Sequence, residues 1–215
     1  MQTFDEYLAK TESAVRHLFG AIDAYRSVLD KVRAPIFISS TLDDQERDRE
    51  LQAWLARHAD AIQAARESER RYFDESFALA TICGAVLQVA DKAIECFSEH
   101  TEIRPDWQGI LTEHSARYGI GRIVRNVPLG LIVLAGRNQH MHFDNEKPRK
   151  LTIMVFDRLA IYHGRNTDPE IRDPAFDLRN ERLVSYAHNI AAILEWDSYD
   201  AYEADLRQAV ESARP

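Results

Sequence analysis

The sequence predicts an all-α fold, a helical bundle of about six to eight helices. The 215 residues include only 8 glycines and 7 prolines, which is too few for a turn-dense β architecture. Apolar residues recur at helical spacing through most of the chain, and no segment shows the sustained alternation typical of strands. Hydrophobic residues make up 45% of the chain, so the expected helices can bury a core.

Residues 1–70 are predicted to form a helical extension packed on the main bundle. Thr3 and Glu6 have the spacing of a capping box, and apolar residues follow at helical spacing to about Lys31. A proline then interrupts the pattern. A second helix is expected from Asp43 to about Arg71, and its thin apolar stripe predicts that most of its surface is solvated.

Residues 71–215 are predicted to form the main helical domain. From Tyr72 to Phe97 apolar residues cover most of the helix circumference, as expected of the central helix of a bundle. A short helix is expected after Asp106. Asn126 is then expected to cap another helix with Pro128 in its first turn, where a missing N–H costs nothing.

The helix that follows Asn126 is expected to run to Pro148, which marks its end or a kink. Three further helices are predicted, from Leu151 to Tyr162, from Leu178 to Leu194, and a short terminal helix opened by Asp200. A polar loop with two prolines separates the first two of these.

The charge and the termini limit the classes of function. A formal net charge of −8 disfavours broad coating of nucleic acid, but a local cluster of arginines could still act on a phosphodiester. No basic region precedes an apolar stretch at the amino terminus, and no segment approaches the ~18 apolar residues that span a bilayer. We therefore expect a cytoplasmic protein with no membrane contact. Cys83 and Cys96 are expected to be small buried thiols in a reducing compartment.

One sharp chemical signal is the run Arg137-Asn138-Gln139-His140-Met141-His142. Its arginine–histidine spacing alone decides nothing, because two other pairs in the chain also fit it. This match differs because a polar block directly follows an apolar helical turn. On a helix Asn138 and His142 are i,i+4 neighbours, and the long side chain of Arg137 can reach the same groove.

These three side chains suit cleavage of a phosphodiester without a metal or cofactor. An imidazole can move a proton on or off a ribose hydroxyl or a leaving oxygen, and a guanidinium can hold the charge that develops on phosphorus. One helix presents only one such half-site. A second copy is therefore expected across a two-fold dimer axis.

The segment from Ala135 to Phe143 resembles the Arg-polar-x3-His signature of the HEPN superfamily, and the helical order is similar. The resemblance implies a bundle that forms a homodimer through the motif helix. It implies a metal-independent endoribonuclease that cleaves RNA by 2′-hydroxyl attack, in toxin–antitoxin or antiviral defence, with an antitoxin protein as a candidate partner. By that resemblance Arg137 and His142 are catalytic and Asn138 supports them.

Residues near the motif are candidates for auxiliary roles. His140, three residues after the arginine, can line the groove as an auxiliary donor, although a solvent-exposed position fits equally well. Glu146, four residues after His142, can orient the imidazole or can be an ordinary solvated carboxylate. Arg149 and Lys150 are candidate substrate-binding residues that contact phosphate, or ordinary surface charges.

Two other interpretations stay open. The stretch from His140 to Asp144 also resembles the His-x-His-x-Asp run of metallo-β-lactamase-like hydrolases. There the histidines follow a strand and point the same way, whereas on a helix residues i and i+2 lie about 200° apart and do not easily share a zinc ion. The other alternative is a non-catalytic interaction module, such as an antitoxin-like or scaffold member of the HEPN superfamily.

Overall fold

The computed structural model describes residues 3–29, 35–143, 148–161 and 172–213. Most of these residues are helical, which confirms the predicted all-α class. In chain order the elements are α1 (Phe4–Leu29), α2 (Asp44–Arg57), α3 (Ala59–Phe97), the 3-10 helix η1 (Pro105–Trp107), α4 (Glu113–Ala116), β1 (Ile123–Val124), β2 (Val127–Pro128), α5 (Leu129–Met141), α6 (Lys150–Ile161), α7 (Ala187–Ile193) and α8 (Tyr199–Glu211).

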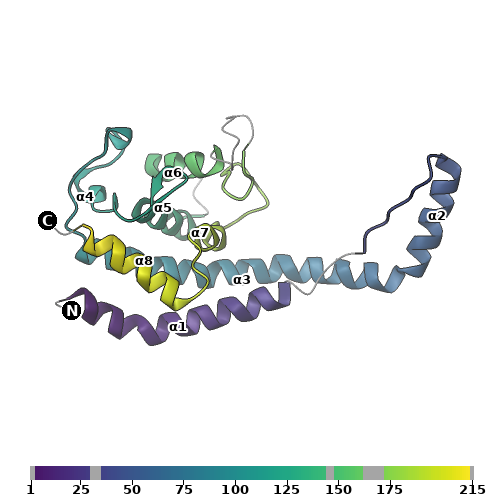
Figure 1. The fold of residues 1–215 in the computed structure, drawn as a ribbon, viewed down its shortest axis with the longest axis horizontal. Helices are drawn as coiled ribbons and strands as arrows, with labels where there is room; N and C mark the ends of the chain where they lie inside the picture. Colours follow the sequence, from purple (N-terminus) through teal and green to yellow (C-terminus); the bar gives the residue numbers. More distant parts are fainter. Residues whose placement is uncertain (1–2, 30–34, 144–147, 162–171, 214–215) are drawn as a thin grey trace. The chain divides into compact units, whose positions relative to one another are not determined.

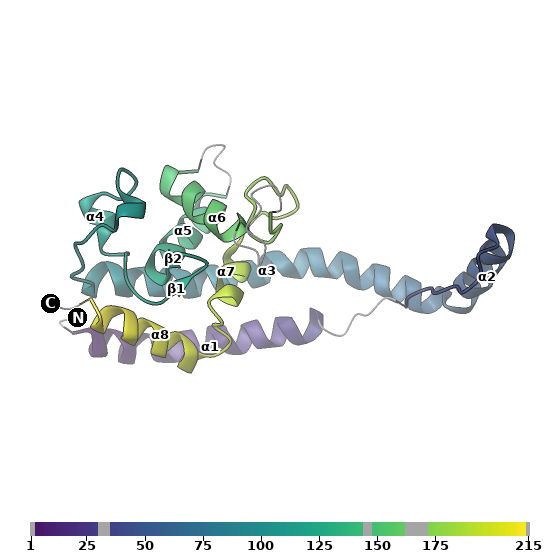
Figure 2. The ribbon, with the colours of Figure 1, turned by 45° about the horizontal axis from the view of Figure 1, so that its top comes forward.

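The chain divides into two compact units. The first contains Met1–Ile22 and Leu79–Pro215, and the second contains Asp23–Ala78. This division differs from the predicted boundary after residue 70, because the start of α1 belongs to the core of the first unit. In that unit α1 runs alongside α3 (Figures 1 and 2), and the Tyr7 hydroxyl donates to the Val89 carbonyl over 2.8 Å.

Within the first unit, α3 is the central helix that the apolar pattern predicted. Its buried side chains include small and branched apolar residues over several turns, namely Leu79, Cys83, Val86, Leu87, Ala90 and Ile94. Cys83 is buried as expected, but Cys96 is exposed, which corrects the prediction for that thiol.

One stretch of α3, Glu75–Phe97, is long and apolar enough to cross a membrane by length and composition. The expectation that no segment comes near this limit was therefore wrong. Of the 18-residue apolar window in this stretch, 56% is buried inside the fold, and buried core helices meet the same criteria, so the stretch is weak evidence for a membrane span.

In the second unit, the predicted helix from Asp43 to about Arg71 is interrupted early. Asp43 caps α2 and accepts hydrogen bonds from the backbone of Gln45 and Glu46, whereas the sequence suggests a start after Ser40 or Thr41 with Asp43 inside the first turn. The helix ends at Arg57, and α3 begins two residues later. Neither Gly nor Pro marks this break, so local sequence signals do not predict it. As predicted for a solvated helix, α2 has no buried residue.

A short hairpin precedes α5 and replaces the predicted helix cap at Asn126. β1 and β2 pair antiparallel, with Val124 opposite Val127. Arg125 and Asn126 form the turn between them, at φ values of 46° and 64°. Asparagine is favoured both as a helix cap and at left-handed turn positions, so its presence alone could not distinguish the two.

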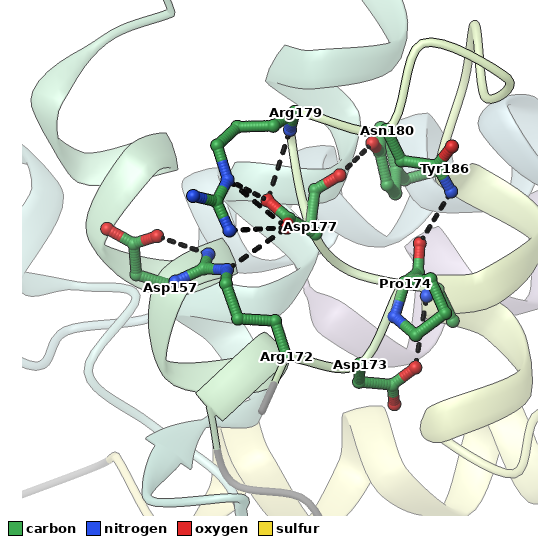
Figure 3. Close-up of polar contacts among 9 residues, drawn as sticks. Asp157, Arg172, Asp173, Pro174, Asp177, Arg179, Asn180 and Tyr186 are labelled. Atoms are coloured by element: carbon green, nitrogen blue, oxygen red, sulfur yellow. Dashed lines mark hydrogen bonds and ion pairs between the residues drawn. The ribbon is translucent and has the colours of Figure 1, made fainter. Parts of the chain in front are cut away.

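The predicted helix from Leu178 to Leu194 is mostly an ordered loop, and only α7 is helical. Figure 3 shows why: Asp177 Oδ1 accepts from the Arg179 backbone N–H over 3.1 Å, and the carboxylate also accepts from the Arg179 side chain and pairs with Arg172. The Asn180 amide donates to the Pro174 carbonyl over 2.9 Å. Such bonds from aspartate and asparagine side chains compete with helix formation.

Candidate functional site

The motif lies at the carboxyl end of α5. The first half of this helix is buried among α3, α6 and α7, and Gly136 sits so close to Ile190 and Leu87 that an added Cβ would lie 2.9 Å from the nearest Ile190 carbon. Because Gly136 packs this closely against Leu87 of α3 and Ile190 of α7, the backbone of the polar residues that follow it is held in place. The helix ends at Met141 and His142 is its cap, so the predicted extension to Pro148 was wrong.

Arg137 is held by α3. Its Nε donates to Gln88 Oε1 over 2.8 Å, and its Nη1 donates to Asn138 Oδ1 over 2.9 Å. Asp91 Oδ2 lies 3.7 Å from the same Nε. Within the described part of the chain no acceptor engages Nη2, so this group can donate to a ligand.

Asp91 is a buried carboxylate behind the arginine. It is 3% exposed, and the Tyr118 hydroxyl donates to its Oδ1 over 3.0 Å. Burial raises the pKa of Asp91, while the Tyr118 hydrogen bond and the charge of Arg137 oppose that rise. Burial and the neighbouring carboxylate also raise the pKa of Tyr118. The guanidinium of Arg137 thus compensates a charge that would otherwise be costly to bury.

A first pocket, called here the cationic pocket, lies beside Arg137 and has a volume of about 380 Å³. It is lined by four cationic side chains and two carboxylates, and both carboxylates are partnered: Asp91 as described, and Glu95 by Lys92. The cationic residues are Lys92, Arg137, Arg149 and Lys150. An excess of positive charge in a concave site favours an anionic ligand such as phosphate.

A second pocket, called here the His142 pocket, has a volume of about 510 Å³. It is lined by the end of α5, the start of α6 and the loop before α7. Its lining consists of Asn138, Gln139, His142, Phe143, Pro148, Arg149, Thr152, Leu178, Glu181, Leu183, Val184 and Tyr186. The imidazole of His142 is exposed and can reach a ligand in this pocket.

The two pockets adjoin, because Asn138 and Arg149 line both of them. Of the predicted site residues, Arg137 and Lys150 line the cationic pocket and His142 lines the other. The structure therefore places five of these residues along one surface, with Arg137 and His142 on either side of Asn138.

His140 lies elsewhere. Its Nδ1 is 2.8 Å from the Ser185 hydroxyl, and its ring packs against Gly84 of α3. Burial lowers the pKa of His140, which favours the neutral imidazole. The ring thus lies between α3 and the loop before α7 and lines neither the cationic pocket nor the His142 pocket. Glu146, the other auxiliary candidate, lies outside the described residues.

The arrangement of the two histidines bears on the metal interpretation. His140 lies within α5 and His142 caps it, so neither follows a strand as the metallo-β-lactamase-like run requires. Among the residues that the structure describes, no group of three His, Cys, Asp or Glu side chains is placed to hold a metal ion. Asp144, the third member of that run, lies outside the described residues.

Several contacts of this site could not be anticipated from the sequence. Gln88 and Tyr118, which hold Arg137 and Asp91, are distant in sequence from the motif, and local periodicity carries no signal for such contacts.

Comparison with known proteins adds no assignment, since no family model matches the chain and neither the curated proteins nor the solved structures gave a match.

Proposed function

We propose that this protein is a metal-independent endoribonuclease of the HEPN type. One observation carries the proposal: Asn138 and Arg149 line both pockets, so the guanidinium of Arg137 and the imidazole of His142 border one continuous surface. A phosphodiester chain laid across this surface meets cations on one side and a proton carrier on the other.

The roles follow from the chemistry of each group. The 2′-oxygen of the substrate attacks phosphorus and the bond to the 5′-oxygen breaks, which leaves a 2′,3′-cyclic phosphate and a 5′-hydroxyl. His142 moves the proton on or off one of these oxygens, because a neutral imidazole can accept a proton and an imidazolium can donate one. Arg137 donates through its Nη2 to the phosphorane, since its Nε is bound to Gln88 and its Nη1 to Asn138. Arg149 and Lys150 contact flanking phosphates.

We propose a homodimer because the motif presents one exposed imidazole, that of His142, whereas the reaction uses both a base and an acid. A two-fold axis near the end of α5 would bring in a second His142. Met141 and Phe143, on either side of His142, are 53% and 49% exposed. These apolar side chains would be covered in such a dimer.

The experiment is cleavage of a labelled RNA pool in EDTA, with the ends mapped. Wild type is expected to leave 2′,3′-cyclic phosphates, and both His142→Ala and Arg137→Lys are expected to lose about a hundredfold or more in rate. Lysine keeps a cation opposite Asp91, so that variant folds. His17→Ala, on the exposed side of α1, is the matched control and keeps the wild-type rate. Cutting that EDTA abolishes would contradict the proposal.

One observation favours a second candidate, the non-catalytic interaction module. Arg137 is bound to Gln88 and Asn138 and lies beside Asp91, so it also serves to hold α5 on α3. If a folded wild-type dimer cuts no RNA, the motif is structural and this candidate replaces the nuclease.

A role in toxin–antitoxin or antiviral defence, with RNA as target and an antitoxin protein as partner, belongs to the same proposal. Expression of the wild-type chain should then slow growth, and His142→Ala should relieve the effect. Equal growth with both chains would remove the toxin assignment, and it would leave the cleavage assay unaffected.

A further inference from the structure

The His142 pocket has a different chemical character from the cationic pocket beside it. Among its lining residues, Arg149 is balanced by a carboxylate, Glu181, and the remainder includes several apolar side chains. Val184, in its loop wall, is 50% exposed. A pocket that combines apolar surface with one carboxylate is unsuited to a phosphate but suited to a nucleobase, which has apolar faces and a polar edge.

We propose that the His142 pocket binds the base of the nucleotide whose 2′-hydroxyl attacks, and that Glu181 makes guanine the preferred base at that position. The inference rests on the proposed function, because it assumes that His142 moves the proton of the attacking 2′-hydroxyl and thereby places that nucleotide at the pocket.

The position of the base follows from the reach of His142. To move the proton of the attacking hydroxyl, the imidazole must come within about 3 Å of the 2′-oxygen. The base is attached to the neighbouring ribose carbon, so it lies within a few bond lengths of the same imidazole. The pocket that His142 lines is therefore the space available to this base.

The preference for guanine follows from the donors on its edge. Guanine presents two adjacent donors, N1–H and the N2 amino group, and a carboxylate can accept from both. Adenine, cytosine and uracil each present a single donor group on the same edge.

The loop that carries Glu181 is held in place before any ligand binds. The amide of Gln139 holds the carboxyl end of this loop, since it donates to the Val184 carbonyl over 3.1 Å and accepts from the Tyr186 backbone over 2.9 Å. Asn180, directly before Glu181, donates to Pro174 and accepts from the backbone of Arg182. Figure 3 shows Asn180 and Tyr186 within this network. A fixed carboxylate discriminates between bases better than a mobile one.

The test is equilibrium binding of dinucleotides whose first sugar lacks the 2′-hydroxyl, so that no cleavage can occur. Wild type should bind the guanine form about tenfold more tightly than the adenine form. Glu181→Gln replaces one acceptor with a donor and should abolish this preference. Glu181 is exposed, so the variant folds, and the exposed Glu211→Gln at the end of α8 is the matched control that keeps it.

A second readout is the base found 5′ of each cut in the RNA assay, which should be guanine for wild type and not for Glu181→Gln. Equal binding of all bases by wild type, or a guanine preference that survives Glu181→Gln, overturns the inference. The two proposals fail differently. Cleavage without base preference leaves the nuclease and removes the pocket assignment, whereas guanine-selective binding without any cleavage removes the nuclease and leaves Glu181 as a guanine-binding group.

Discussion

The imidazole of His140 lies directly against the backbone of Gly84, so that a Cβ added to Gly84 would come within 2.2 Å of the ring atoms Cδ2 and Nε2. At this contact α5 packs directly on α3. One turn further along α3, Gln88 bonds Arg137. The contact between Gly84 and the His140 ring therefore sets the spacing of α3 and α5 at which Arg137 reaches Gln88.

We expect Gly84→Ala to destabilise the protein by about 1–3 kcal/mol, because the new methyl group overlaps a ring whose other side is held by Ser185. Denaturant unfolding measures the change. Gly20→Ala, in α1, meets nothing within 4 Å and should stabilise the protein by up to about 1 kcal/mol through helix propensity.

The double variant Gly84→Ala/His140→Ala separates overlap from any other cost of the alanine. Removing the ring makes room for the methyl group, so we expect the two changes to be coupled by about 1 kcal/mol or more. Additive effects would show that the contact between Gly84 and His140 does not limit the packing.

Acid should destabilise the protein through His140. Burial holds the pKa of this imidazole below its usual value of 6.5, so the unfolded chain binds the proton more readily than the folded one. The free energy of unfolding should therefore fall as the pH drops below about 6.5. His140→Asn should show a smaller fall between pH 8 and pH 5 in denaturant titrations, whereas the exposed His17→Asn should behave like wild type.

Arg137→Met should cost about 2–3 kcal/mol at pH 7, because it leaves the buried Asp91 charge with Tyr118 as its remaining close partner. The pKa of Asp91 is already raised by burial, and loss of the cation raises it further. Protonation then relieves the cost, so the penalty should shrink as the pH falls from 7 towards 5. Unfolding curves at both pH values measure it.

Two variants control this prediction. In an Asp91→Asn background the same arginine change should cost less by about 1–2 kcal/mol, because no buried charge remains. Arg149→Met, exposed at the edge of the same pocket, should change stability by no more than about 0.5 kcal/mol. An equal cost for both arginines would mean that Asp91 does not depend on Arg137.

The loop beside the His142 pocket should open in strong acid. Hydrogen bonds from Arg179, with the charge of Arg172, lower the pKa of Asp177 to about 2. A lowered pKa means that the stabilisation is complete above the ordinary value near 4 and is lost as the pH falls from there towards 2. Pepsin digestion at pH 2 to 4 should show cleavage in residues 172–186, and Asp177→Asn should be cut already at pH 4. Asp197→Asn, exposed and outside this network, should be cut like wild type.

The helices were predictable wherever capping and apolar spacing act together. Thr3 accepts from the Glu6 backbone at the start of α1, and the apolar run to Phe97 forms the central helix, because both depend on neighbours within a few residues. The helix predicted from Leu178 was wrong over most of its length, because hydrogen bonds from side chains to the backbone form an ordered loop there instead. The helix cap predicted at Asn126 was wrong because helix caps and left-handed turns both favour asparagine.

The candidate site was predictable in its residue types and only partly in its geometry. The sequence indicated that Arg137, Asn138 and His142 lie near one another, since they share one short segment. It could not indicate that the helix ends at Met141, or that Gln88 and Asp91 hold the arginine from a helix about fifty positions earlier. Contacts of that kind depend on tertiary packing, which local spacing does not encode.

Asn138 touches both pockets and accepts a hydrogen bond from Arg137. A ligand group that engages this amide from the His142 side therefore alters the environment of the arginine on the other side. Such linkage is reciprocal: whatever factor base binding applies to phosphate affinity, phosphate binding must apply to base affinity. The binding free energy of an RNA that fills both pockets should therefore differ from the sum of the values for its two fragments. The size of that difference measures how far one amide couples the two pockets into a single site.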